Sequence, residues 1–417
     1  MKISEEMIDL GNNAKKAARH LRFLSSENKN EALSVISANI LQNKANILDE
    51  NRKDMQYGVD KCLSDSMLDR LYIDENRLEG IIKSLESIIK LRDPVGSLIE
   101  EFLRPNGLLI KKVRTPIGVI GVIYESRPNV TVDAGALCFK SGNASILRCG
   151  SESYNTSRAF GACFKKGFQE VGLSEDSVQV VPTRDRSAVK QMLNMTDHLD
   201  VIVPRGGKGL VNLVQTEARV PVFAHLEGIV HIYIHADADP QKVSNVILNS
   251  KIRRPGICGA VECLLIDKEF SRKHGTTIID ELILAGVNVK VTADLLNIKG
   301  TNLADQTDWG KEFLDMTIAV RTVENIVEAI SYIELYGSHH TDCIITESDK
   351  AAESFFLELD SAIVIRNAST QFADGGEFGF GAEIGIATGK IHARGPVGLE
   401  QLTTFKYIVE GNGQIRP

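Results

Sequence analysis

The strongest constraint on the fold is a regular alternation of short apolar runs and helical segments that begins at Pro116. The runs IGVIGVI, ASILRC, SVQVVP and LDVIVP are each followed by a segment with helical spacing, such as residues 157–171. A second series follows Gly228, with HIYIHA, CLLID, VNVKVT, DCIITE and SAIVIRN. Strands that alternate with helices form parallel sheets covered on both faces. We therefore predict two α/β domains, each with a parallel sheet between helical layers.

The segments outside this alternation predict a helical layer and a small β arm. Residues 1–93 have apolar positions at helical spacing, and Asp74 is a suitable N-cap for the last of these helices. Between residues 97 and 115, Pro105-Asn106-Gly107 separates two apolar stretches and predicts a hairpin. The C-terminal segment LTTFKYIVEGNGQIRP is again strand-like, and we expect it to pair with that hairpin. An arm built from distant segments suits subunit exchange in a homo-oligomer.

Charge and cysteine usage narrow the functional class. The net charge of -7 gives the chain no general attraction to nucleic acid or to anionic membranes. No run approaches the ~20 apolar residues of a membrane span. The N-terminal segment has polar residues where a secretory signal peptide would have its apolar region. The seven cysteines lack a C-x-x-C motif, so we expect reduced thiols and no structural zinc. These features predict a cytoplasmic enzyme that acts on small molecules.

Cys258 is the candidate nucleophile. It lies in NSKIRRPGICGAVECLLID, where a helical pattern that carries Arg253 and Arg254 breaks at Pro255-Gly256. A cysteine on a tight turn beside basic residues has a depressed pKa and is available as a thiolate. The other cysteines inside apolar helix or strand patterns are typical of small buried side chains.

Two glycine-rich segments are candidate binding sites. In VIVPRGGKGLVNLV, Gly206 and Gly207 stand between a predicted strand and a predicted helix, where free N–H groups bind phosphate. The segment 367–398 combines many glycines with Glu383, His392 and Arg394, which is typical of a loop around a ligand.

Three histidines lie close together in the sequence at positions 225, 231 and 235. Their spacings of six and four residues span both strand-like and turn-like segments, so we expect that the three side chains do not share a face. We therefore expect no metal site among them.

The segments TPIGVIGVIYESRPNVTVDAGALCFKSGNASILRCGSES and VPRGGKGLV, the Cys258 segment and the glycine-rich stretch together resemble the γ-glutamyl phosphate reductase family. This family, also called glutamate-5-semialdehyde dehydrogenases, belongs to the aldehyde dehydrogenase superfamily. The resemblance runs from about residue 5 to the C-terminus. It implies an aldehyde dehydrogenase-like α/β fold with two Rossmann-like three-layer domains and a small β oligomerisation arm. The implied parts are a cofactor-binding domain (1–96 and 116–228), a catalytic domain (229–398) and the arm (97–115 and 399–417).

The reaction that this resemblance implies is the NADPH-dependent reduction of γ-glutamyl 5-phosphate to glutamate 5-semialdehyde and phosphate, the second step from glutamate to proline. Cys258 would attack the acyl phosphate and form a thioester, which hydride from the cofactor then reduces. Asn129, in SRPNV, lies where the superfamily has its oxyanion asparagine. With the Cys258 backbone N–H it would stabilise the oxyanion formed at each step.

The resemblance also implies binding residues. For NADPH these are Arg148 and Ser151 at the 2′-phosphate, Gly206 and Gly207 at the pyrophosphate, and Glu312 at the nicotinamide ribose. The substrate carries an amino-acid head and a phosphate, so we expect an arginine at each anion. The candidates are Arg127, Arg254 and Arg394, with Glu125 for the ammonium group. The sequence does not assign a particular arginine to either anion.

The chain departs from the family pattern close to the candidate nucleophile. The family usually has Asn at the position of Gly259, Thr at Cys263, Cys at Val230 and Arg at Gln371. Gly259 would change how the Cys258 turn is braced, and Gln371 removes one possible anion contact. Because RRPGIC is retained, we expect activity to be retained.

Two other functions are compatible with these motifs. One is an acylating aldehyde dehydrogenase that acts on another substrate, since one fold supports several activities. The other is a catalytically impaired family member that acts as a binding partner, for instance of glutamate 5-kinase. Because γ-glutamyl phosphate is labile, transient contact with the kinase that makes it is expected for an active enzyme as well.

Overall fold

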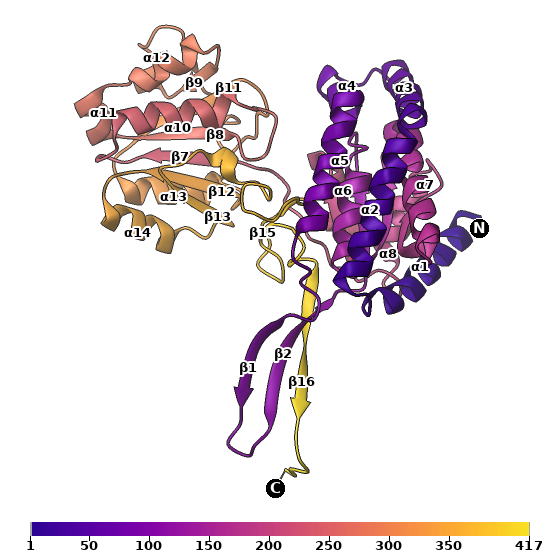
Figure 1. Ribbon diagram of the computed structural model, residues 1–417. Helices are drawn as coiled ribbons and strands as arrows, with labels where there is room; N and C mark the ends of the chain where they lie inside the picture. Colours follow the sequence, from indigo (N-terminus) through magenta and orange to yellow (C-terminus); the bar gives the residue numbers. More distant parts are fainter. Residues whose placement is uncertain (1, 417) are drawn as a thin grey trace. The chain divides into compact units, whose positions relative to one another are not determined.

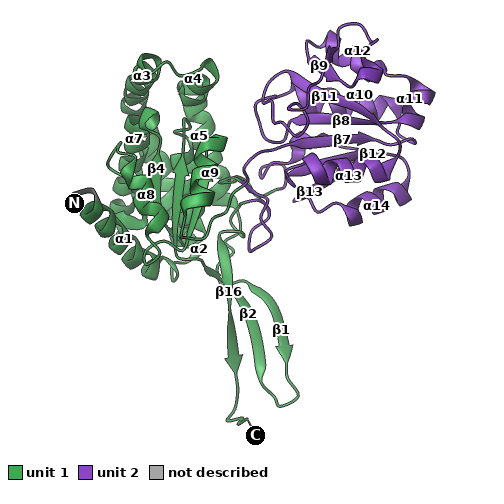
Figure 2. Cartoon of the chain, turned by 180° about the vertical axis from the view of Figure 1, so that it is seen from behind, with its two compact units in different colours: residues 1–224, 379–385, 397–417 green, residues 225–378, 386–396 purple. Residues whose placement is uncertain are grey.

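The computed structural model describes residues 2–416 and divides into two compact units (Figure 2). Unit 1 contains the chain up to Ala224, residues 379–385 and the segment from Val397 onward. Unit 2 contains His225–Phe378 and Ile386–Pro396. The glycine-rich segment 367–398 is therefore shared between the two units. Among the described residues, the structure has no helix with the length and apolarity that a membrane crossing requires.

Unit 1 begins with helices, as the apolar spacing of residues 1–93 predicted. The α5 helix begins at Glu75 because the Asp74 carboxylate accepts a hydrogen bond from the Arg77 N–H at 2.8 Å. Its apolar stripe, which includes Leu78 and Leu85, is buried. The helices of unit 1 are α1 (Lys2–Leu21), α2 (Ser26–Gln42), α3 (Lys44–Asp60), α4 (Asp65–Leu71), α5 (Glu75–Lys90), α6 (Val130–Lys140), α7 (Tyr154–Glu170), α8 (Ser187–Asn194) and α9 (Lys208–Glu217), with short 3₁₀ turns η1 (Ser151–Ser153) and η2 (Glu175–Ser177).

A parallel sheet forms the centre of unit 1, in the order β5-β4-β3-β6. Its strands are β3 (Val119–Tyr124), β4 (Ala144–Cys149), β5 (Val178–Val180) and β6 (Val201–Arg205). Every residue of β3 and β4 is buried, which explains the unbroken apolar run of β3 and the mainly apolar sequence of β4. At the carboxyl end of the sheet the Glu125 N–H donates to the Arg205 carbonyl at 3.0 Å. This pairing brings Glu125 beside the glycines that follow β6.

The β arm of unit 1 combines a hairpin with the C-terminal strand (Figure 1). Strands β1 (Leu98–Leu103) and β2 (Leu109–Pro116) are antiparallel, and Gly107 adopts a positive φ of 84° in the turn between them. Strand β16 (Thr403–Glu410) pairs with β2, from Thr403 opposite Pro116 to Glu410 opposite Leu109. The expected pairing of the C-terminal tail with the hairpin is therefore present.

Unit 2 contains a parallel sheet in the order β10-β9-β11-β8-β7-β12-β13. Its strands are β7 (Val230–Ile234), β8 (Val261–Asp267), β9 (Asn288–Val291), β10 (Asn302–Leu303), β11 (Thr317–Val323), β12 (Thr341–Ile345) and β13 (Ile363–Arg366). The helices and turns of this unit are α10 (Pro240–Ile252), α11 (Lys268–His274), α12 (Thr277–Leu284), α13 (Ile326–Tyr336), α14 (Asp349–Glu358), η3 (Ala293–Leu295) and η4 (Thr370–Phe372). A short antiparallel pair, β14 (Ile386–Ala387) with β15 (Gly395–Pro396), lies in the glycine-rich segment.

Both faces of the unit 2 sheet are buried. Along β8, Leu264 and Ile266 pack into one apolar cluster while Cys263 and Leu265 pack into the other. Helices therefore cover the sheet on two sides, as predicted for both domains. Strand β11 was missed in the sequence, although it lies between β9 and β8. Arg321 interrupts its apolar run there, and its guanidinium pairs with Glu328 at 3.2 Å.

Candidate active site

Cys258 lies in the turn between α10 and β8 of unit 2. Asp239 starts α10 by accepting from the Gln241 N–H at 2.7 Å, and Pro240 occupies the first turn, where no N–H is needed. The helix ends at Ile252, whereas the sequence pattern predicted that it would continue through Arg253 and Arg254. Cys258 follows on the irregular segment before β8 and is half-buried. Cys258 therefore stands at the amino end of β8, a central strand of the sheet.

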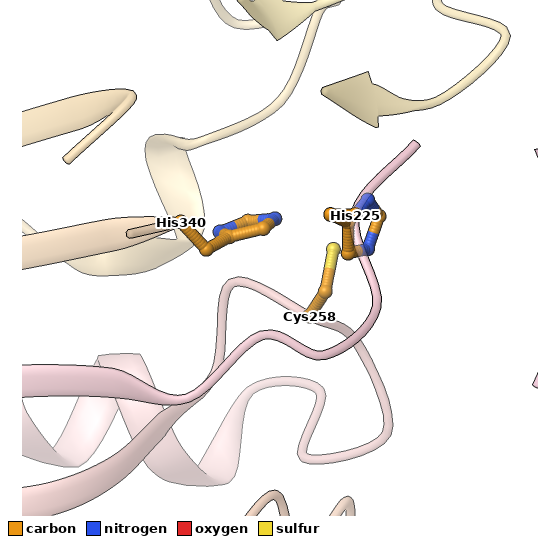
Figure 3. Close-up of side chains that lie close together, drawn as sticks. All are labelled: His225, Cys258 and His340. Atoms are coloured by element: carbon orange, nitrogen blue, oxygen red, sulfur yellow. The ribbon is translucent and has the colours of Figure 1, made fainter. Parts of the chain in front are cut away.

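Two histidines flank the Cys258 thiol (Figure 3). One ring nitrogen of His225, one of His340 and the Cys258 Sγ all lie within 4.8 Å of one another. His225 precedes β7, and His340 is fully buried immediately before β12. The amino ends of three neighbouring parallel strands, β7, β8 and β12, thus bring together side chains that are far apart in the sequence.

The histidines change the ionisation of the thiol. Burial disfavours the thiolate, but His340 and then His225 outweigh it through charge and hydrogen bonding, and the pKa of Cys258 lies well below its usual range. The sequence pattern predicts that the flanking arginines lower the pKa of Cys258, but the histidines are the groups that lower it. Arg253 instead donates to the Gln371 amide oxygen at 3.2 Å.

The other buried cysteines have the opposite ionisation. Burial raises the pKa of Cys149 and Cys163 to about 11, and that of Cys263 and Cys343 to about 12. These thiols stay protonated at neutral pH and are poor nucleophiles.

Hydrogen bonds on the far side of each imidazole fix the orientation of the rings. The Nδ1 atom of His225 lies 2.5 Å from the Ile386 carbonyl oxygen, so this nitrogen carries the proton that it donates. The Nδ1 atom of His340 shares a hydrogen bond of 2.9 Å with the Thr341 hydroxyl. The Nε2 atom of His340 is buried and has no hydrogen-bond acceptor or donor among the described N and O atoms. Cys258 Sγ is the polar partner within reach.

Gly228 and Glu312 lie beside the turn that carries Cys258. A Cβ atom on Gly228 would lie 2.3 Å from the Cys258 carbonyl oxygen, so this position tolerates only glycine without a shift of backbone. The Gly228 N–H donates to the Glu312 carboxylate at 2.9 Å. Burial raises the pKa of Glu312, the Gly228 hydrogen bond opposes this, and the negative Cys258 adds to the rise. Glu312 therefore lies beside the nucleophile, in the same unit.

Gln371, Gly259 and Cys263, which depart from the family pattern, each contact neighbouring residues of unit 2. Gln371 donates from its amide to the Ser250 carbonyl at 3.0 Å and so holds the end of α10. The Thr370 hydroxyl donates to the Gly259 carbonyl at 2.7 Å, which braces the turn directly after Cys258. A Cβ on Gly259 would lie 3.1 Å from the Thr370 carbonyl oxygen. Cys263 is buried on β8, and its Sγ lies 3.8 Å from the Tyr332 hydroxyl.

A buried ion pair lies behind the turn. Lys251, in the last turn of α10, contacts the Glu262 carboxylate at 2.7 Å, and both side chains are at most 1% exposed. The second Glu262 oxygen accepts from the Leu314 N–H at 3.1 Å. The pair therefore connects α10 and β8 with the loop that carries Glu312.

In unit 1, three of the predicted binding residues come together. The Gly207 N–H, at the N-terminus of α9, donates to the Glu125 carboxylate at 3.0 Å. A Cβ atom on Gly206 would lie 2.5 Å from the same carboxylate oxygen. Burial raises the pKa of Glu125, and the Gly207 hydrogen bond opposes that rise. The helix N-terminus thus already faces an anionic group.

The other predicted residues of unit 1 are placed as follows. Arg148 is 4% exposed, and its guanidinium donates to the Arg184 and Asp185 carbonyls at 3.1 and 3.3 Å. The Ser151 hydroxyl lies 3.5 Å from the Glu152 carboxylate. Asn129 stands at the N-terminus of α6, and its amide donates to Asp133 at 3.0 Å.

The predicted arginine clamps differ in their surroundings. Arg127, in unit 1, is half-buried, and Arg254, in unit 2, is exposed. The Arg394 guanidinium pairs with the Asp360 carboxylate at 2.7 Å.

Neither histidine beside the thiol was identified in the sequence as part of the site. His225 was considered only as a metal ligand with His231 and His235. His231 instead bonds to Asp342 at 3.0 Å, and His235 bonds to Thr346 at 2.8 Å. The available signal was the position of both histidines before buried strands of one sheet: His340 stands directly before β12, and His225 stands a few residues before β7.

Comparisons with known proteins identify the family of this chain. The model of the aldehyde dehydrogenase family matches residues 8–282. A γ-glutamyl phosphate reductase from Rhizobium johnstonii is 53% identical over 413 residues, which is 99% of this chain and 97% of the relative. The crystal structure of γ-glutamyl phosphate reductase from Thermotoga maritima superimposes with a TM-score of 0.96 at 39% identity, covering 99% of this chain and 100% of that one. An acetylating aldehyde dehydrogenase from Geobacillus thermoglucosidasius, 15% identical with a TM-score of 0.70, covers 100% of this chain and 98% of its own and shares the fold.

The family match covers more than half of the chain, and the relatives named γ-glutamyl phosphate reductase align over nearly its full length. The predicted aldehyde dehydrogenase-like α/β fold and the predicted family are both confirmed. The chain therefore belongs to the aldehyde dehydrogenase family and, within it, to the γ-glutamyl phosphate reductases.

Proposed function

We propose that this protein reduces γ-glutamyl 5-phosphate to glutamate 5-semialdehyde and phosphate with NADPH, through a thioester on Cys258. The observation that carries the proposal is the low-pKa Cys258 thiol between His225 and His340. The similarity to γ-glutamyl phosphate reductases over 99% of the chain supports the choice of substrate.

The first chemical step needs only a thiolate and a good leaving group. Cys258 Sγ attacks the acyl carbon, the S–C bond forms, and the C–O bond to phosphate breaks as phosphate leaves with the bonding electrons. The imidazoles keep the sulfur ionised before attack, so no separate base has to remove a proton at that moment. No water attacks the thioester in the productive reaction, and a deacylating base is therefore not required.

An oxyanion develops on the acyl oxygen in each step and needs hydrogen-bond donors. We propose the Cys258 backbone N–H and the Asn129 amide for this role. The Asn129 Nδ2 carries two hydrogens, and Asp133 accepts only one of them, at 3.0 Å. The other hydrogen is available to an oxyanion.

A nicotinamide cofactor fits unit 1. The α9 N-terminus binds the Glu125 carboxylate through the Gly207 N–H, and the lack of a side chain at Gly206 lets this carboxylate approach. The pyrophosphate would take the place of the Glu125 carboxylate at this helix N-terminus. We propose that Gly206 and Gly207 hold the pyrophosphate, Arg148 and Ser151 the 2′-phosphate, and Glu312 the nicotinamide ribose. NADPH, when bound, supplies the hydride that reduces the thioester. The buried Arg148 also keeps the Arg184–Asp185 backbone in place through its two hydrogen bonds to carbonyls.

The substrate binds through its charges. We propose that arginines among Arg127, Arg254 and Arg394 contact its carboxylate and phosphate, and that Glu125 contacts its ammonium group. The exposed Arg254 follows α10 on the Cys258 turn, which favours it for the phosphate that leaves there. Arg394 would have to share its guanidinium between the substrate and Asp360.

The reaction is tested most directly in reverse, as phosphate-dependent reduction of NADP⁺ by glutamate 5-semialdehyde. Wild-type protein is compared with Cys258→Ala and with the control Cys62→Ser, which changes an exposed cysteine far from the site in the sequence. We expect activity in the wild type and the control and none in Cys258→Ala. Activity that persists in Cys258→Ala would contradict the thioester mechanism, and activity that persists without phosphate would contradict phosphate as the acceptor of the acyl group.

The same assay separates the alternative activities. Replacing phosphate by coenzyme A tests an acylating aldehyde dehydrogenase, because the acyl group would then be released to a thiol. Absence of both activities in a correctly folded wild-type protein would favour a non-catalytic binding partner.

We propose a homo-oligomer that assembles through the β arm. Apolar side chains are exposed on both outer strands of this arm: Leu98, Ile99 and Leu103 on β1, and Phe405, Tyr407 and Val409 on β16. Exposed apolar edges of this kind are covered in stable assemblies. Sedimentation of wild type and Phe405→Asp would test it, since a wild-type monomer would contradict the proposal.

We also propose a cytoplasmic location and transient contact with glutamate 5-kinase. Within residues 2–416 every cysteine is a free thiol, which is typical of a reducing compartment. The kinase contact is supported by the lability of an acyl phosphate. Pull-down with the kinase, with and without its substrates, would test it.

A further inference from the structure

The Cys258 cluster has the composition of a transition-metal site. Thiolate sulfur and imidazole nitrogen are the donors that Zn²⁺ takes in proteins, and three protein ligands with one open position are common in zinc centres. The three donor atoms lie within 4.8 Å of one another (Figure 3). Mg²⁺ and Ca²⁺ prefer oxygen ligands and do not match this set.

The hydrogen bonds around the imidazoles are those that metal-binding histidines need. A ligating histidine usually donates its other ring N–H to a carbonyl or a similar group, which fixes the tautomer and directs the free lone pair at the metal. His225 does this through the Ile386 carbonyl, and His340 contacts the Thr341 hydroxyl. The buried Nε2 of His340, which has no N or O partner among the described residues, is an independent sign of a missing ligand.

Binding of the metal would be coupled to loss of a proton. A thiolate, rather than a thiol, binds Zn²⁺, so a Cys258 thiol would release its proton when the metal binds. The Glu312 carboxyl is held by the Gly228 N–H at 2.9 Å, beside the Cys258 turn.

We propose that His225, Cys258 and His340 form a binding site for Zn²⁺ or a cation of similar preference, and that the bound metal reversibly blocks the nucleophile. Coordination occupies the sulfur lone pair that would attack the acyl carbon. The imidazoles, when they bind the metal, no longer stabilise a free thiolate. The site is thus either a reactive thiol or a metal centre, but not both.

Binding is measured on the full-length protein after removal of metal with a chelator. Competition with a chromophoric zinc indicator should give one tight equivalent per chain in the wild type. Cys258→Ser and His340→Gln should weaken binding by more than the roughly 10- to 100-fold loss that follows removal of an outer partner of a metal ligand. Thr341→Val, which removes only the hydroxyl beside His340, should show a loss within that smaller range.

Cobalt gives a second measurement that does not depend on activity. Co²⁺ in a thiolate-containing tetrahedral site produces a sulfur-to-metal charge-transfer band and intense visible bands. We expect both bands in the wild type, loss of the charge-transfer band in Cys258→Ser, and altered visible bands in His340→Gln. Far-UV circular dichroism and Trp309 fluorescence identify any variant that fails to fold, and His225→Gln then replaces it because His225 is only half-buried.

Two matched controls separate this site from adventitious binding. Cys62→Ser and His20→Ala remove an exposed cysteine and an exposed histidine elsewhere and should leave zinc binding unchanged. Zn²⁺, but not Mg²⁺, should inhibit the enzyme, and a chelator should restore activity. Zinc binding that survives in both Cys258→Ser and His340→Gln, or that disappears in Cys62→Ser, would overturn the proposal. Because binding is measured without turnover, these results are independent of the proposed reaction.

Discussion

Removing the amino group of Lys251 should destabilise unit 2 strongly, since it leaves a carboxylate buried without its partner. The Lys251 Nζ contacts the Glu262 carboxylate at 2.7 Å and the Val261 carbonyl at 3.0 Å, and both side chains are at most 1% exposed. The substitution Lys251→Met keeps most of the side-chain volume. Breaking a buried ion pair on one side costs about 3 to 5 kcal/mol.

The loss should depend on pH in a defined direction. Burial raises the pKa of Glu262 to about 7, against the charge and hydrogen bond of Lys251, which lower it. In Lys251→Met these two opposing effects disappear, so the pKa of Glu262 rises further. A carboxyl with a raised pKa in the folded state contributes stability at low pH and loses that contribution as pH rises through the folded value. The variant should therefore lose more stability at about pH 8.5 than at about pH 6.

Urea unfolding followed by Trp309 fluorescence measures this loss. Trp309 is the only tryptophan in the sequence and packs against Tyr332 in unit 2, with ring centroids 6.2 Å apart. With a urea slope of about 2 to 3 kcal/mol per M, the midpoint should fall by about 1 to 2 M at the higher pH.

Two comparisons make the result interpretable. Adding Glu262→Gln to Lys251→Met removes the buried charge and should recover stability and abolish most of the pH dependence. Lys268→Met removes an exposed partner of Glu324 and should change the midpoint little. If Lys251→Met behaved like Lys268→Met, or lost equal stability at both pH values, the argument from the buried pair would be refuted.

Three further predictions test the site and one helix start. In Gly228→Ala, the new Cβ would lie 2.3 Å from the Cys258 carbonyl oxygen, and a displacement of about 1 Å should lower kcat on the order of 100-fold in the steady-state assay. In Asn325→Ala, α13 loses a cap that accepts from the Val327 N–H at 2.9 Å, and Trp309-detected urea unfolding should show a loss of about 1 kcal/mol. The pH profile of Cys258 alkylation by iodoacetamide, read by peptide mapping with a chelator present, should have its midpoint below the ordinary thiol value of about 8.5. His340→Gln should move that midpoint upward, and an unchanged midpoint would contradict the role of the imidazole.

The fold was largely predictable because its central strands are buried on both faces and therefore read as mainly apolar runs. Strands β3, β4, β7 and β8 are of this kind, with every residue buried. Strand β11 was missed because its apolar run stops at Arg321 and Thr322, which are only half-buried. Burial on both faces is thus what makes a strand visible in a single sequence.

The site was predictable only where the signal is local. Pro255 and Gly256 mark a turn shortly before Cys258, and this local pattern made Cys258 the candidate nucleophile. The partners of the thiol are not local, since His225 and His340 reach it through the register of strands that follow them on the sheet. Arg253 shows the opposite error, because its closeness in sequence suggested a charge effect while its side chain contacts Gln371 instead.

The reactive state of Cys258 and its proposed metal-bound state require the same electron pair, and this makes the two proposals testable against each other. The imidazoles favour the thiolate, and a thiolate binds either an acyl carbon or Zn²⁺. An acylated Cys258 has no thiolate to offer a metal. Incubation with γ-glutamyl phosphate before addition of Zn²⁺ should therefore prevent tight binding of one Zn²⁺ per chain. Incubation with NADP⁺ alone should not prevent it. If zinc bound equally well to the acylated protein, the sulfur would not be a ligand, and the metal would have to lie on the histidines alone.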